Sequence, residues 1–207
     1  MEKFDRHALV AALDAVGDLL YERGHTAKVL VVGGAALVLR GLVERTTVDV
    51  DVLALLYESG LSHPDPFPPH IQEIVETVAN EYGYASDWMN GHAARLWNDV
   101  WPEGLPEQLQ KGVIWKTYGG LQVGLVGREA LVALKVYAVV NGDSRQTVIE
   151  TGQLATDANT LRHLNDLTRL APSDAELAEA KLWLEEQNQG QSFLRALEAV
   201  LRHVQGT

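Results

Sequence analysis

Residues 28–53 read KVLVVGGAALVLRGLVERTTVDVDVL, and this stretch decides most of the expected fold. Lys28 to Val32 is a short β-branched run that stops at Gly33-Gly34, which indicates a strand followed by a tight turn. Ala35 to Leu42 then regains helical character. From Thr47 to Leu53 valines alternate with polar residues, which is the period of a strand with one dry and one wet face. The stretch therefore predicts strand, turn, helix and second strand.

The wet face of the second strand carries two aspartates, Asp49 and Asp51. Alternate side chains of a strand point to the same side, so both carboxylates are expected to project together and to share one hard divalent cation. The glycine pair allows a backbone to approach a triphosphate closely, and the start of the following helix favours an anion. Paired carboxylates, a divalent metal and a phosphate-binding turn are what phosphoryl or nucleotidyl transfer requires.

The remaining elements follow from apolar periodicity. Helices with an apolar face are predicted at His7–Tyr21, Ile71–Tyr82, Arg128–Val140, Asn159–Leu170, Asp174–Gln187 and Ser192–Val204. A hairpin is predicted from Val113–Tyr118 and Leu121–Val126, joined at Gly119-Gly120. Ser59–Pro69 contains four prolines and predicts an irregular loop. Ser173 and Glu176 predict a capping box at a helix start.

Together these elements predict an α/β (α+β) fold, in which a mixed sheet is flanked by helices and followed by a C-terminal helical bundle. We expect a catalytic core in residues 1–150 and a helical region in residues 151–207. The strand that carries the aspartates is expected beside the Val29–Val32 strand.

The composition and charge of the chain limit the classes of partner that it is expected to bind. The 207 residues carry 17 Lys and Arg against 28 Asp and Glu, for a net charge of −11, so binding to duplex DNA is not expected. The absence of cysteine leaves only oxygen or imidazole ligands for a metal. No segment is typical of an export signal or a membrane span, which predicts a cytoplasmic protein with no membrane partner.

The string Arg45-Thr46-Thr47-Val48-Asp49-Val50-Asp51 after Gly33-Gly34 resembles the glycine turn and Asp-x-Asp motif of DNA-polymerase-β-like nucleotidyltransferases. It is most similar to the bacterial toxin-type branch, which includes AbiEii-type and mycobacterial tRNA-modifying toxins. In that branch the string is followed by a helix with a lysine, matched by Lys135, and by a helix with Asp-Leu, matched by Asp166-Leu167. The resemblance extends over about Val29 to Leu170.

The resemblance implies a function for each matched residue. Asp49 and Asp51 would bind Mg²⁺ or Mn²⁺, and together with Lys135 and Asp166 they would be catalytic. Gly33, Gly34, Arg45, Thr47 and Lys135 would bind the NTP. The implied partners are an NTP, a tRNA or other RNA end, a protein or a small molecule as acceptor, and a cognate antitoxin.

Two departures from the family pattern keep alternatives open. The strand Leu121–Val126 lacks the third carboxylate of the archetype, which favours a non-catalytic binding or regulatory member of the fold. His163 stands where the toxin branch often has an aspartate, and Asp157 is a candidate to replace it. A dinucleotide-binding module is the other alternative, although Gly33-Gly34 lacks the later glycine of that fingerprint.

Four tryptophans lie between the glycine turn and the C-terminal helices: Trp88, Trp97, Trp101 and Trp115. Buried aromatics are the usual case, so these are expected to pack in the core. One of them remains a candidate to receive a nucleobase.

Overall fold

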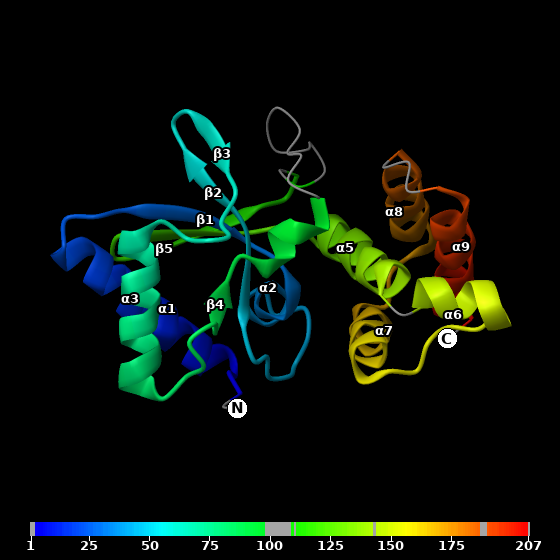
Figure 1. Cartoon of the computed structure of the whole chain (residues 1–207), viewed down its shortest axis with the longest axis horizontal. Coiled ribbons are helices and arrows are strands. Elements are labelled where there is room, and N and C mark those ends of the chain that lie inside the picture. Colours follow the sequence, from blue (N-terminus) through cyan, green and yellow to red (C-terminus); the bar gives the residue numbers. More distant parts are fainter. Residues whose placement is uncertain (1–2, 98–108, 110, 143, 187–189, 207) are drawn as a thin grey trace. The chain divides into compact units, whose positions relative to one another are not determined.

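The computed structural model describes residues 3–97, 109, 111–142, 144–186 and 190–206 (Figure 1). The chain forms two compact units, Met1–Gly127 and Arg128–Thr207. These units are defined by packing, and the functional division after residue 150 expected from the sequence stays a prediction.

The first unit is built on a mixed sheet. Its strands are β1 (Ala27–Val31), β2 (Val50–Tyr57), β3 (Gly60–Ser62), β4 (Met89–Asn90), β5 (Ile114–Tyr118) and β6 (Leu121–Leu125). The order is β3-β2-β1-β6-β5, and β4 pairs with the first residues of β2. β1 runs parallel to β6 and antiparallel to β2, while β5 and β6 form an antiparallel hairpin. The predicted mixed sheet and the pairing of the two key strands are confirmed.

Helices cover one face of this sheet. This unit contains the α-helices α1 (Arg6–Glu22), α2 (Gly33–Leu39) and α3 (Pro69–Tyr82), and η1 (His92–Trp97) is a 3₁₀ helix. α1 packs on β5 and β6 and also contacts α2 and α3 (Figure 1). The apolar stripe predicted for α1 is buried, with Leu9, Leu13, Val16 and Leu20 fully enclosed. Asp5 caps the helix by accepting a 2.8 Å hydrogen bond from the Ala8 amide.

Two details of the expected strands are wrong. β2 begins only at Val50, and Thr47 instead forms an isolated bridge with Phe4. Gly60–Ser62 is a strand, although the proline-rich segment around it was expected to be irregular throughout. Strand β3 forms because β2 extends to Tyr57 and its end folds back on itself as a hairpin. The short elements β4 and η1 were not predicted from the sequence.

A β-bulge interrupts the pairing of β1 with β2. Leu30 lies opposite Ala54, but the next residue, Val31, lies opposite Val52. Leu53 is therefore an extra residue in β2. A bulge of this kind reverses which side of the sheet the residues before it face.

The second unit is helical. Its described residues form the helices α5 (Arg128–Asn141), α6 (Ser144–Thr151), α7 (Ala158–Leu170), α8 (Asp174–Glu186) and α9 (Gln191–Gln205). α5 is buried on nearly all of its sides and packs against α7, α8 and α9. Leu177, Ala180 and Leu184 are buried, as the apolar stripe of α8 predicts. The C-terminal helices are thus confirmed, while α6 was not anticipated.

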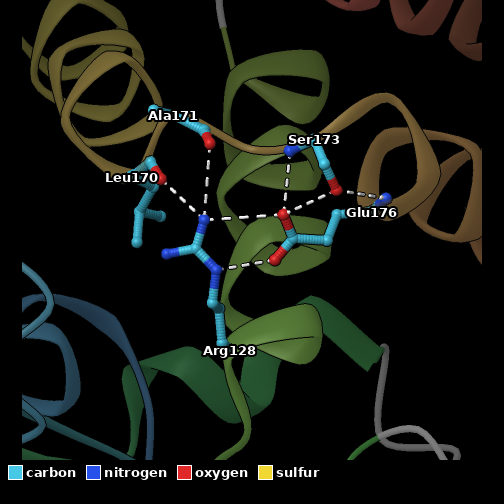
Figure 2. A network of polar contacts seen from close by, with 5 residues as sticks. All are labelled: Arg128, Leu170, Ala171, Ser173 and Glu176. Carbon is cyan, nitrogen blue, oxygen red and sulfur yellow. Dashed lines mark hydrogen bonds and ion pairs between the residues drawn. The ribbon is translucent and has the colours of Figure 1, made fainter.

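A polar network holds the start of α5 to the junction between α7 and α8 (Figure 2). Arg128 forms a 2.6 Å ion pair with Glu176 and donates a 2.6 Å hydrogen bond to the Leu170 carbonyl. Glu176 in turn accepts a 2.8 Å hydrogen bond from the Ser173 amide, and its own amide lies 3.3 Å from the Ser173 hydroxyl. This reciprocal pair is the predicted capping box.

None of the helices in the described part of the chain has the length and apolarity needed to cross a membrane.

Candidate functional site

The glycine turn lies between the end of β1 and the start of α2. Gly33 adopts a φ of +67°, in the left-handed region that glycine enters without the steric cost of a Cβ. The Val32 amide donates a 3.0 Å hydrogen bond to the Asp51 carbonyl, which holds the turn against the first residues of β2. The backbone therefore brings the glycine pair and the aspartate strand together.

Three polar side chains lie directly against the glycine pair. A Cβ on Gly33 would lie 2.1 Å from Oδ2 of Asp51. A Cβ on Gly34 would lie 2.5 Å from the Thr47 hydroxyl and 2.9 Å from a guanidinium nitrogen of Arg45. Glycine is thus required by close approach at both positions, and the cradle it forms is lined by one carboxylate, one hydroxyl and one cation.

Asp49 is joined to this cluster through Thr47. The Thr47 hydroxyl lies 3.4 Å from Oδ1 of Asp49 and 3.4 Å from its carbonyl oxygen, and it can donate to either. Thr47 is itself fixed by two backbone hydrogen bonds with Phe4, of 2.7 and 2.8 Å. Arg45 donates a 2.7 Å hydrogen bond to the Thr46 carbonyl, which orients its guanidinium. The first unit therefore gathers six of the predicted site residues: Gly33, Gly34, Arg45, Thr47, Asp49 and Asp51.

The bulge at Leu53 determines which face of the sheet Asp51 occupies. Val52 pairs with Val31, so it shares the helix-covered face with Val31 and Val29. Asp51, one residue earlier, therefore projects to the opposite face. Without the extra residue the alternation of β2 would have turned this carboxylate toward the helices. The valine–aspartate alternation predicted a shared face for the acids, but it could not tell which face.

The site has the donor chemistry of a hard divalent cation. Asp49 and Asp51 are both partly exposed, and both contribute oxygen donors beside the glycine turn. Within the described residues, no group of three or more His, Cys, Asp or Glu side chains gathers that could hold a metal. The residues thus fit a metal that takes most of its ligands from water and a bound phosphate.

Asn90 is a neighbour of the site that the sequence did not indicate. β4 pairs with β2 in parallel and places Asn90 opposite Asp51. Asn90 is 8% exposed. Its side-chain amide donates a 3.0 Å hydrogen bond to the Asp87 carbonyl, and its side-chain oxygen accepts a 2.9 Å hydrogen bond from the His92 amide. It fixes the loop beside Asp51. A two-residue strand has too little periodicity to be detected from sequence.

In the second unit, Lys135 and Asp166 form a buried ion pair. Lys135 Nζ lies 2.8 Å from Asp166 Oδ2, with side-chain exposures of 6% and 1%. Lys135 Nζ also lies 3.2 Å from Nδ1 of His163. A lysine ammonium has only hydrogens to offer, so Nδ1 of His163 acts as the acceptor. The structure therefore brings Lys135, Asp166 and His163 together across α5 and α7.

Asp157 has a defined structural task. It is the N-cap of α7, and its Oδ1 accepts hydrogen bonds of 2.9 and 3.0 Å from the amides of Asn159 and Thr160. Hydrogen bonds from the Thr160 side chain and then from the backbone lower the pKa of Asp157 below its ordinary value. Its position at a helix start accounts for Oδ1 of Asp157, whereas a catalytic role for this residue stays a prediction.

The two described tryptophan side chains from this set, Trp88 and Trp115, differ in burial. Trp88 is buried, as expected, and donates a 3.1 Å hydrogen bond to the Val75 carbonyl. Trp115 is 43% exposed, so the expectation that it packs in the core is wrong. It lies on β5 at the edge of the sheet. The side chain of Trp97 and the whole of Trp101 lie outside the described residues.

A comparison with protein families supports this assignment of the segment. A family model described as a nucleotidyltransferase of unknown function (DUF6036) matches residues 8–61, the segment from α1 to the start of β3. This segment contains all six clustered residues of the first unit, and the match supports a nucleotidyltransferase family. No curated protein and no solved structure matches the chain.

Proposed function

We propose that this protein is a metal-dependent nucleotidyltransferase that moves a nucleotide from an NTP to an acceptor. The observation that carries the proposal is the packing of Asp51, Thr47 and Arg45 against the side-chain-free backbone of Gly33 and Gly34. The family match over the same segment supports it.

Each residue of the cluster has a task that follows from its chemistry. Asp49 and Asp51 would hold a magnesium or manganese ion, which supplies charge neutralisation at the transferred phosphate. The triphosphate would bind beside the turn at Gly33 and Gly34, and the Arg45 guanidinium would donate hydrogen bonds to its oxygens. Thr47 restrains Asp49 through its hydroxyl. Positioning and charge are the main contributions that nucleotidyl transfer needs from a protein.

The tasks proposed for Lys135 and Asp166 rest on the resemblance. Their ion pair is buried within the helical unit, so a phosphate contact by Lys135 requires the pair to open or an oxygen to reach it from outside. Asp166→Asn keeps the shape of the carboxylate but removes the charge that pairs with Lys135, so its melting temperature must be measured beside its activity. Lost activity in a variant that melts like the wild type supports the catalytic role.

We further propose that the acceptor is an RNA end such as that of a tRNA, a protein side chain or a small molecule, and that the protein acts in the cytoplasm as the toxin of a toxin–antitoxin pair. The first experiment incubates the protein with labelled NTPs and candidate acceptors. Asp49→Ala serves as the control, and labelling that survives this substitution contradicts the proposal.

The second experiment measures metal dependence without an acceptor. Two neighbouring carboxylates repel each other in the absence of a cation, and the triphosphate supplies ligands that the protein lacks. Magnesium with NTP should therefore raise the melting temperature by more than the sum of their separate effects. Asp51→Asn should abolish this synergy while keeping the fold.

A non-catalytic protein of the same fold is the second candidate. It is favoured by the lack of a third metal-binding side chain near the described acids. NTP-dependent stabilisation that is equal with and without magnesium, together with no labelled acceptor, would establish it in place of the enzyme.

A further inference from the structure

The two aspartates of the candidate site are held in different ways. Asp51 belongs to β2, where its carbonyl accepts a 3.0 Å hydrogen bond from the Val32 amide and β4 pairs beside it. Asp49 directly precedes the first residue of β2 and lies in neither a helix nor a strand. The pairing of the sheet therefore holds Asp51 directly, whereas the position of Asp49 depends on the contacts of its neighbours.

Two backbone anchors flank Asp49. On one side, Thr47 exchanges two hydrogen bonds with Phe4, of 2.7 and 2.8 Å. On the other side, the Val50 amide donates a 2.6 Å hydrogen bond to the Trp88 carbonyl. Only two residues lie between the anchors, so the places of the anchors determine where the Asp49 carboxylate lies.

The residues that provide both anchors belong to one aromatic cluster. The centre of the Phe4 ring lies 4.5 Å from that of Tyr84 and 5.6 Å from that of Trp88. Phe4 and Trp88 are each 1% exposed. The Trp88 indole also donates a 3.1 Å hydrogen bond to the Val75 carbonyl on α3. The groups that hold the backbone on either side of Asp49 are thus packed against each other and joined to α3.

We propose that Phe4, Tyr84 and Trp88, called here the aromatic clamp, position Asp49 for metal binding. They are positioning residues, because they act on the carboxylate through the two backbone anchors. Contacts of this kind, outside the ligands themselves, set the orientation of a ligand and with it the affinity of a metal site. The proposal rests on the nucleotidyltransferase function proposed above and deepens it, because it adds positioning residues to the same site.

Thr47 connects the clamp to the carboxylate. Its hydroxyl lies 3.4 Å from Oδ1 of Asp49, and a Cβ on Gly34 would lie 2.5 Å from the same hydroxyl. Thr47 is 5% exposed and its backbone is paired with Phe4. A displacement of Phe4 therefore moves both the hydroxyl and the backbone that precede Asp49. A shift of about 1 Å at a catalytic group is enough to cost about 100-fold in rate.

The clamp joins the segment that matches the nucleotidyltransferase model to residues on both sides of it. That match covers residues 8–61, so it includes Thr47 and Asp49 but excludes Phe4, Tyr84 and Trp88. The residue after Phe4 is the N-cap of α1, which ties this end of the clamp to a helix. The clamp therefore adds support to the site from outside the matched segment.

Amide hydrogen exchange, followed by NMR without ligand, tests the clamp itself. Phe4→Leu keeps an apolar side chain but removes the ring, so the Thr47 and Val50 amides should exchange faster than in the wild type. The Val32 amide, which is bonded to the Asp51 carbonyl and not to the clamp, should exchange as in the wild type. Unchanged exchange at Thr47 and Val50 in a folded variant overturns the proposal.

Calorimetry with non-hydrolysable NTP analogues tests whether the clamp positions the carboxylate. Affinity is measured with and without magnesium, at a temperature at which every variant is folded. Magnesium should strengthen binding to the wild type, and Phe4→Leu should reduce this gain about ten-fold or abolish it, as is typical when an outer contact of a metal ligand is lost. Binding without magnesium should change little. An equal gain in the wild type and in Phe4→Leu overturns the proposal.

Phe193→Leu is the matched control, because it makes the same change at another fully buried phenylalanine. Phe193 lies on α9, and its ring centre is 5.8 Å from that of Tyr137. The substitution should lower the melting temperature but leave the gain from magnesium unchanged. If Phe193→Leu and Phe4→Leu lose the gain equally, general destabilisation explains the effect and the proposal is overturned.

Tyr84→Leu keeps the test decisive if Phe4→Leu does not fold. It removes the ring that lies closest to Phe4 in the clamp and leaves Phe4 with its backbone bonds to Thr47. The gain from magnesium should fall in the same direction. An unchanged gain in this variant overturns the proposal.

Failure of this inference is distinct from failure of the proposed enzyme. A wild-type protein that binds the analogues no more tightly with magnesium contradicts the metal site, and the positioning role is then wrong as well. A wild-type protein that shows the gain, together with clamp variants that show it equally, keeps the metal site and overturns only the clamp.

Discussion

At the scale of single residues, the candidate site depends on what Gly33 and Gly34 lack. Any side chain there would occupy the space of the Asp51 carboxylate, the Thr47 hydroxyl or the Arg45 guanidinium. The sequence showed that a glycine pair and an aspartate pair stand near each other. It could not show that they touch, because that contact depends on the register of β1 against β2.

Gly33→Ala should both destabilise the protein and abolish its stabilisation by magnesium with NTP. A left-handed alanine costs about 1–2 kcal/mol, and its Cβ also displaces Asp51. Gly41→Ala is a matched control, since Gly41 has a φ of +70° and nothing within 4 Å of the added carbon. Thermal melts with and without magnesium and NTP measure both effects. Equal loss of ligand response in the two variants would show that backbone strain, and not the Asp51 contact, matters.

At the scale of elements, local patterns predicted most helices and the β5–β6 hairpin correctly. The sequence signal was strong where a single turn or a single apolar stripe defines the element. Examples are the Gly119-Gly120 turn between β5 and β6 and the apolar stripe of α8. The prediction failed where an element depends on a distant partner. Thr47 leaves the strand to pair with Phe4, and β4 exists only because it meets the start of β2. The ion pair between Lys135 and Asp166 likewise joins helices whose packing no local pattern records.

The capping box of α8 should make the helical unit sensitive to acid. Burial raises the pKa of Glu176, but hydrogen bonds from Arg128 and Ser173 outweigh it and hold the pKa below its ordinary value of 4.5. A carboxyl whose pKa is lower in the folded state stabilises the fold above the unfolded pKa, and this contribution is lost as pH falls through the folded pKa.

Glu176→Gln should therefore lower the free energy of unfolding by about 2 kcal/mol near neutral pH, and the difference from wild type should shrink as pH falls below 4.5. Urea titrations across this pH range measure it. Glu198→Gln, at an exposed position on α9, should show little effect at any pH. A difference that stays constant with pH would mean that the charge of Glu176 does not stabilise the fold.

At the scale of the whole molecule, the chain carries a net charge of −11. The charge balance was readable from the sequence. The contact between the Lys28 ammonium and the Trp115 ring was not, because it requires the order of strands in the sheet.

A chain that ends at Ala171 should aggregate. This truncation removes α8 and α9, whose buried residues include Trp183, Leu184, Phe193 and Leu197, and it uncovers α5. It also deprives Arg128 of Glu176. Size-exclusion chromatography should show oligomers or no soluble protein, whereas a chain that ends at Gln205 and keeps all of α9 should elute like the full chain. A monomeric, cooperatively melting fragment that ends at Ala171 would contradict this.

The bulge at Leu53 shifts the in–out alternation of β2 by one residue, so the residues before it face the opposite side of the sheet from the one that regular alternation would give. Deleting this one residue should restore regular alternation and turn Asp51 toward the helices, where an unpaired carboxylate is costly to bury. Leu53→Ala keeps the residue count and should cost about 2–5 kcal/mol of packing while Asp51 stays on its face. Magnesium with NTP should therefore still raise the melting temperature of Leu53→Ala but not of the deletion variant. The number of residues in this strand, more than their composition, determines which face of the sheet Asp51 occupies.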